Sequence, residues 1–160
     1  MVPILKPKCY QVKANDLKLI KRLSNWHFEE WGIPKERTLS RLVNHLNDDA
    51  LVQLVLKEGN RIIATGGLFN NTGLTLILPK YKALSPWIAQ LYTDKPYRSK
   101  GYGSILLKML EEYALKSGFT QVYLYTSTAE RLYKRCGYVQ MERLRYRDAN
   151  TVVMEKNLGN

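Results

Sequence analysis

The sequence predicts an α+β fold, in which a mixed, mostly antiparallel sheet of six to seven strands is flanked by about four helices. Short runs rich in β-branched and aromatic residues recur along the chain and are typical of strands. Apolar residues at helical spacing stand between some of these runs. The length of 160 residues suits one domain over residues 1–160, because compact domains usually contain roughly 100–150 residues.

The N-terminal part predicts a strand and then two helices. Residues 9–15 have strand character, and Asn15 or Asp16 can cap a helix over residues 17–32. A second helix is expected over residues 36–48. The residues that fall near the inward faces of these helices are Leu19, Ile20, Leu23, Trp26, His27, Trp31, Leu39, Leu42, Val43 and Leu46.

A hairpin and an unassigned segment follow. Residues 50–69 contain two strand-like runs joined by a turn at residues 58–60. Residues 70–84 mix polar and apolar side chains without a clear period, and we interpret them as a long connection.

The next segment predicts a strand, a helix and a second strand. The strands are expected at 85–93 and 120–126, with a helix from about 104 to 116 between them and Gly118 as its C-cap. This succession favours a parallel strand pair with a right-handed crossover. The apolar face of the helix is formed by Ile105, Leu106, Met109, Leu110 and Tyr113.

A short helix and a last hairpin complete the chain. The helix is predicted over residues 128–137, with Ser127 or Thr128 as its cap. The hairpin is expected over residues 138–158, with its turn at residues 148–150.

Composition excludes several classes of protein. No apolar run approaches the roughly 20 residues that span a bilayer, and the N-terminus lacks a signal-peptide core, so we expect no membrane association and a cytoplasmic protein. Cys9 and Cys136 show no metal-ligand spacing, so we expect reduced thiols and no metal site. The formal charge of +11 favours an anionic partner without naming it.

A glycine-rich turn precedes the helix that begins near Ser104. The N-terminus of a helix presents unpaired N–H groups and a partial positive charge, which suit an anion. Gly101 and Gly103 leave those donors accessible, and Arg98 and Lys100 add positive charge. The turn therefore predicts a site for a phosphate-bearing ligand, although the same residues also fit an ordinary turn with exposed basic side chains.

A second cluster lies in the short helix at 128–137. Ala129, Leu132, Tyr133 and Cys136 share one face, so Tyr133 presents its phenol inward near the end of the preceding strand. The alternative is a core tyrosine whose hydroxyl bonds to the backbone.

Together, the two clusters resemble the GNAT superfamily of N-acetyltransferases. The cofactor motif of that superfamily, [Q/R]-x-x-G-x-[G/A], and its later motif, N-x-x-A-x-x-[L/F]-Y-x-x-x-G-[F/Y], occur here in the expected order. The matching residues are Arg98, Gly101, Gly103, Ala129, Leu132, Tyr133, Gly137 and Tyr138. The segments "NWHFEEWG" and "SPWIAQLYT" also resemble a subgroup of small bacterial acetyltransferases that is similar to the enzyme acetylating the actin N-terminus.

The sequence departs from the family pattern at two positions. Lys95 stands where a proline often precedes the arginine, with Pro96 shifted by one residue, which should alter only the loop. Thr126 stands where the second motif has asparagine, so the hydrogen bond that this asparagine makes to pantetheine is not implied for this chain.

The resemblance implies transfer of an acetyl group from acetyl-CoA to a primary amine by direct attack in a ternary complex. Tyr133 would protonate the leaving thiolate, and Trp26, Glu30 and Trp31 would wall the acceptor site. Glu29, Glu30 and His27 are the open candidates for a base, and Arg131, Lys134 and Arg135 for contacts with the ribose phosphate. The residues implied for the cofactor are Leu91, Tyr92, Thr93, Arg98, Ser99, Lys100, Gly101, Tyr102, Gly103 and Ser104.

Two other functions are kept as alternatives on the same fold. One is a nucleic-acid-binding module, against which the intact pair of motifs argues, and the other is an acyl-CoA sensor without turnover. For the enzyme, the acceptor is expected to be a small molecule or a peptide N-terminus. The basic charge favours one with negative charge near its amine, such as an acidic peptide N-terminus, over a polycationic drug or polyamine. The oligomeric state is left as monomer or homodimer.

Overall fold

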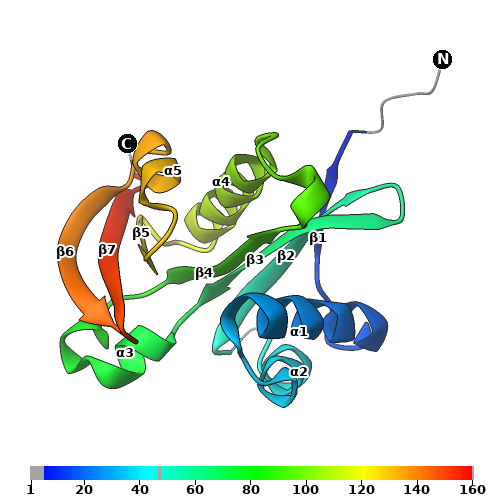
Figure 1. Cartoon of the computed structure of the whole chain (residues 1–160), viewed down its shortest axis with the longest axis horizontal. Helices are drawn as coiled ribbons and strands as arrows, with labels where there is room; N and C mark the ends of the chain where they lie inside the picture. Colours follow the sequence, from blue (N-terminus) through cyan, green and yellow to red (C-terminus); the bar gives the residue numbers. More distant parts are fainter. Residues whose placement is uncertain (1–5, 47, 160) are drawn as a thin grey trace.

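The computed structural model describes residues 6–46 and 48–159 and contains one mixed sheet with helices on both faces (Figure 1). Among these residues seven strands pair in the order β1-β2-β3-β4-β5-β7-β6, and only β4 and β5 are parallel. The strands are β1 (Lys8–Gln11), β2 (Ala50–Glu58), β3 (Arg61–Phe69), β4 (Trp87–Thr93), β5 (Gln121–Thr126), β6 (Val139–Tyr146) and β7 (Ala149–Asn157). The helices are α1 (Leu17–Trp31), α2 (Lys35–Asn44), α3 (Gly73–Ile77), α4 (Tyr102–Lys116) and α5 (Glu130–Arg135), with 3₁₀ turns η1 (Pro79–Tyr81) and η2 (Lys95–Tyr97). The predicted fold class is confirmed.

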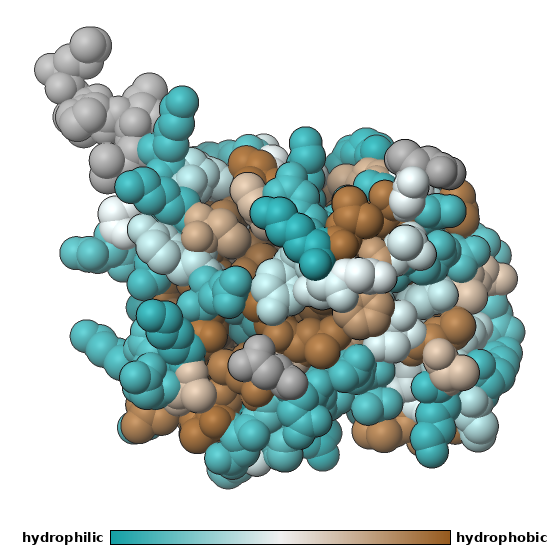
Figure 2. Space-filling view, turned by 180° about the vertical axis from the view of Figure 1, so that it is seen from behind, coloured by the Kyte–Doolittle hydropathy of each residue, from teal (hydrophilic) through white to brown (hydrophobic). Residues whose placement is uncertain are grey.

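The alternation of side chains along the strands builds a core on each face of the sheet. Leu54 of β2 packs into the cluster that α4 covers, whereas its neighbour Val55 packs into the cluster under α1 and α2. Figure 1 shows α4 on one side of the sheet and the α1–α2 pair on the other. Seen from the opposite side, hydrophilic side chains surround groups of apolar side chains that are exposed over the middle of the face (Figure 2).

The face of α4 that packs on the sheet differs from the predicted one. Leu107 and Ala114 are buried together with Leu106 and Leu110, whereas Ile105 is 41% exposed and Met109 is 37% exposed. The helix has two overlapping apolar faces, and the one that contains the small side chain of Ala114 packs on the sheet. Ile105 and Met109, which were predicted to face the core, therefore lie near solvent.

Two predicted turn positions also need correction. The N-cap of α5 is Ala129, without a side-chain cap, and not Ser127 or Thr128. Thr126 Oγ1 instead accepts the N–H groups of Thr128 (3.2 Å) and Ala129 (3.0 Å) in the turn before the helix. The last hairpin turns at Arg147 and Asp148, which have φ values of 48° and 58°. Two successive residues at positive φ close a two-residue hairpin whose twist matches the strands, so residues 149 and 150 belong to β7.

The segment that we interpreted as a long connection forms α3 and η1 and has a small core of its own. Leu74 and Tyr81 pack with Trp87, Tyr123 and Val153 from the sheet. At its far end, Lys80 Nζ lies 2.6 Å from Glu142 Oε2 of β6, and the Tyr81 hydroxyl donates to the same carboxylate. The connection between β3 and β4 is thus held against the β6–β7 hairpin.

Candidate active site

The parallel strands β4 and β5 separate soon after they meet. Trp87 and Tyr123 form their one registered pair among the described residues, and the Tyr123 N–H donates to Pro86 O over 3.1 Å. Further along β4, Gln90 has a φ of 58° and the register with β3 shifts between Thr65 and Gly67, which is a β-bulge. The β5-facing edge of β4 beyond Trp87 is therefore left without a strand partner.

The turn between β4 and α4 exposes a row of backbone donors. Ser99 and Gly101 are left-handed, with φ values of 62° and 86°, and no side chain caps α4. Within the described part of the chain, the N–H groups of residues 99–104 donate no backbone hydrogen bond. Unpaired donors at a helix N-terminus fit the pyrophosphate of an acyl-CoA.

A cleft of about 640 Å³ lies over this turn. Glu30, Leu91 and Ala129 line it and also line a second cleft, so the two clefts are contiguous. The remaining lining residues of the first cleft are Tyr92, Thr93, Tyr97, Arg98, Ser99, Gly101, Tyr102, Gly103, Ser104, Leu132 and Arg135. All of the residues implied for the cofactor except Lys100 are therefore gathered around one hollow.

Arg98 connects this turn to β4 and α1. Its Nε donates to Thr93 O over 2.8 Å, and its Nη2 lies 3.8 Å from Glu30 Oε2. The guanidinium also lies over the ring of Tyr92, 5.3 Å from the centroid. These contacts hold a positive charge in the lining of the first cleft.

The second cleft, of about 390 Å³, contains Tyr133. Residues 88–91 of β4 line one wall and residues 125–129 line another. Glu30 and Trp31 approach from the end of α1, and the β6–β7 hairpin closes the opposite side.

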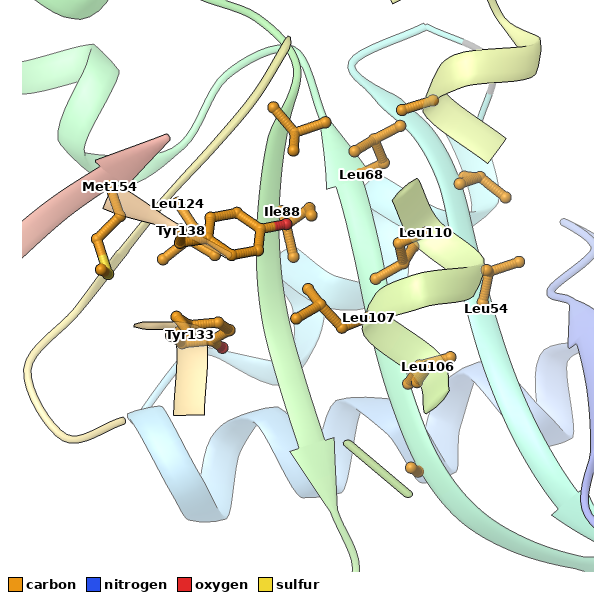
Figure 3. Close-up of a cluster of buried hydrophobic side chains, with 14 of the residues drawn as sticks. Leu54, Leu68, Ile88, Leu106, Leu107, Leu110, Leu124, Tyr133, Tyr138 and Met154 are labelled. Atoms are coloured by element: carbon orange, nitrogen blue, oxygen red, sulfur yellow. The ribbon is translucent and has the colours of Figure 1, made fainter. Parts of the chain in front are cut away.

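Tyr133 is 8% exposed, and burial, with a smaller effect of Cys136, raises its pKa to about 12. The phenol therefore stays protonated at neutral pH. Its ring centroid lies 5.8 Å from that of Tyr138, and Figure 3 shows both rings in the cluster under α4. Tyr138 in turn donates to Glu111 Oε2 over 2.8 Å.

Some predicted residues lie outside both clefts. Trp26 is 7% exposed and packs on Tyr92 with ring centroids 4.9 Å apart. His27 is fully buried, with Nδ1 3.4 Å from Thr38 Oγ1, and burial, with a smaller effect of Arg41, lowers its pKa to about 4. Of the three candidate contacts to the ribose phosphate only Arg135 lines a cleft, since Lys134 pairs with Glu130 at 2.8 Å and Arg131 is absent from both linings.

The sequence reasoning missed Gln90 and Arg147, both of which line the second cleft. The bulge at Gln90 arises from its pairing with β3, which leaves no local signal. Arg147 directly precedes the predicted turn at 148–150. Pairing the two last strands with a two-residue loop between them would have placed Arg147 in the turn.

Two absences and a distant cavity complete the description of the site. None of the helices in residues 6–46 and 48–159 has the length and hydropathy of a membrane span, and these residues contain no cluster of His, Cys, Asp and Glu side chains that could hold a metal ion. A larger hollow of about 790 Å³ lies between the start of α1 and the β2–β3 turn. It shares no lining residue with the two clefts.

The splayed parallel pair and the open start of α4 are those of an acyl-CoA-dependent transferase. The acetyltransferase (GNAT) family model matches residues 20–138, and the chain belongs to this family. Its function is accordingly the transfer of an acetyl group from acetyl-CoA to an amine. An uncharacterised N-acetyltransferase of Bacillus subtilis (strain 168), YhdJ, is 34% identical over 106 residues, which are 60% of this chain and 72% of that protein.

Solved structures support the fold. An aminoglycoside 6'-N-acetyltransferase from Enterococcus faecium superposes with a TM-score of 0.73 at 14% identity, covering 96% of this chain and 98% of that one. The PaiA N-acetyltransferase from Thermoplasma acidophilum, solved with coenzyme A, gives a TM-score of 0.65 at 19% identity, covering 96% of this chain and 99% of that one. Neither the nucleic-acid-binding alternative nor the sensor is favoured by these comparisons.

Proposed function

We propose that the amine attacks acetyl-CoA directly while both are bound, and that Tyr133 supplies the proton that the departing sulfur needs. Bound acetyl-CoA supplies the acetyl thioester. The observation that carries the proposal is the position of Tyr133, which is buried and protonated in the lining of the second cleft, one helical turn from Ala129, which lines both clefts. An ordinary thiol has a pKa of about 8.5, so a thiolate would otherwise leave as an anion into a buried site.

Because burial disfavours a tyrosinate, the Tyr133 proton must be replaced as it is given up. The amine loses one proton as the new C–N bond forms and the C–S bond breaks, and this proton balances the transfer. The reaction therefore starts and ends with a neutral phenol.

The chain's own groups would hold the cofactor as follows. The unpaired N–H groups of residues 99–104 and the side chain of Arg98 face the phosphates, and Lys100 adds charge from outside the cleft. The free edge of β4 at Leu91, Tyr92 and Thr93 offers backbone groups to pantetheine, in the manner of an added strand.

The acceptor would lie between Glu30 and Trp31 on one side and the β6–β7 hairpin on the other. Glu30 is the one base candidate of the three that lines the cleft. We propose an α-amino group as the acceptor, because with a pKa near 7.7–8.0 it is roughly a tenth neutral at pH 7, whereas a lysine near 10.4 is almost fully charged. The charge of +11 supports an acidic acceptor. We further propose that the chain acts as a monomer or a homodimer.

The test is the Tyr133→Phe variant, with Tyr10→Phe on β1, which is 44% exposed, as the matched control. Steady-state release of free thiol should fall about 10²–10⁴-fold in kcat for Tyr133→Phe, while the dissociation constant for acetyl-CoA stays unchanged. Tyr10→Phe should match the wild type. An unchanged kcat in Tyr133→Phe would overturn the role of Tyr133 as the acid.

A further inference from the structure

Two formally charged residues line the second cleft, and only one of them is compensated. Glu30 lies on the α1 side and forms an ion pair with Arg98, whose Nη2 is 3.8 Å from Glu30 Oε2. Arg147 lies on the hairpin side and forms no ion pair with any residue that the structure describes. The uncompensated charge at the acceptor end of the site is therefore a guanidinium.

The position of this guanidinium is set by its surroundings. Arg147 occupies the first place of the two-residue turn, with φ at 48°, and its Cζ lies 5.2 Å from the ring centroid of Tyr146. A Cβ built on Gly73 of α3 would lie 2.5 Å from Tyr146 Oη and 3.2 Å from Arg147 Nη2, so α3 abuts both side chains. An arginine held by stacking and packing loses less conformational freedom when it binds a ligand.

We propose that Arg147 binds a side-chain carboxylate of the acceptor, so that the enzyme selects primary amines with an acidic side chain beside the amine; this inference rests on the proposed function. The planar fork of N–H donors matches the two oxygens of a carboxylate. Acceptors of this class are peptides with an acidic first residue and free acidic amino acids. A polycationic amine is disfavoured because it would place ammonium groups beside Arg147.

The test compares acceptors that differ only in the carboxylate. Thiol release from acetyl-CoA is measured with a short peptide that begins with Asp, with the same peptide beginning with Asn, and with free aspartate. The wild type should prefer the Asp peptide over the Asn peptide by about tenfold to a hundredfold in kcat/KM, the size expected for a hydrogen bond between charged groups. Free aspartate separates a small-molecule acceptor from a peptide one.

Arg147→Gln should remove this preference, and Arg145→Gln is the matched control. Arg145 lies on the same hairpin and loses the same charge, but it is 75% exposed and lines neither cleft. The Arg147 variant should lose the preference through a raised KM for the Asp peptide, with the KM for acetyl-CoA unchanged. Arg147→Glu should shift the preference toward a peptide that begins with Lys.

The outcomes separate the two proposals. Equal rates for the Asp and Asn peptides in the wild type, or equal losses in both glutamine variants, would overturn the carboxylate site and leave the transferase intact. No thiol release with any amine, from protein that binds acetyl-CoA, would overturn both.

Discussion

Trp87 of β4 and Tyr123 of β5 form the one registered pair between these two parallel strands in the described residues, with ring centroids 5.4 Å apart. On one side of this pair lies the small core under α3. On the other side the strands diverge, and the edge of β4 becomes available beside Tyr133. A single aromatic contact thus marks the boundary between the continuous sheet and the two clefts.

The buried His27 should make the protein acid-sensitive. Its pKa falls from 6.5 to about 4 on folding because burial disfavours the imidazolium. The unfolded chain binds the additional proton, so this contribution to stability is present above pH 6.5 and is lost as the pH falls toward 4. Urea unfolding should show a loss of roughly 3 kcal/mol over this range.

The matched variants for this effect are His27→Gln and His45→Gln. His45 has a side chain that is 49% exposed, so its replacement should leave the pH dependence intact. A His27→Gln variant with the same acid slope as the wild type would rule out His27 as the source.

The hairpin tip should depend on the absence of a side chain at Gly73. In Gly73→Ala the added methyl would lie 2.5 Å from Tyr146 Oη, so the side chain of Tyr146 or the hairpin that carries it must shift. We expect a several-fold rise in the KM for the acceptor and a stability loss of about 1–3 kcal/mol, with acetyl-CoA affinity unchanged. Leu76→Ala on the same helix, at a position 78% exposed, should do neither. A normal acceptor KM in Gly73→Ala would show that α3 does not position the hairpin.

A buried polar network should support the ring next to Tyr133. Glu111 accepts hydrogen bonds from Tyr138 Oη and Lys156 Nζ, each at 2.8 Å. Glu111→Gln removes the charge that pairs with Lys156 and should lower the free energy of unfolding by about 1–3 kcal/mol. The neighbouring Glu112 is exposed, and Glu112→Gln should stay within about 0.5 kcal/mol of the wild type. Equal stabilities for the two variants would argue against the network.

Most of the fold could be predicted from local sequence patterns. The features that depend on long-range packing could not. The turn from Arg98 to Gly103 and the inward face of α5 could be predicted because the signals lie within one turn or one helix. The segment at 70–84 could not, because Tyr81 and Leu74 are ordered by contacts with β5, β6 and β7 far along the chain. Arg147 was missed for a related reason, since only the pairing of Tyr146 with Ala149 identifies the turn.

The central claim is that the open start of α4 binds acetyl-CoA. Gly101→Glu places a carboxylate at that start, and Gly118→Glu is its control, because both glycines have positive φ (86° and 94°) and open space around the missing Cβ. Isothermal titration of acetyl-CoA into the wild type and Gly118→Glu should give micromolar binding, and Gly101→Glu should bind too weakly to detect while remaining folded. Equal binding by all three proteins, or no binding by a well-folded wild type, would contradict the account.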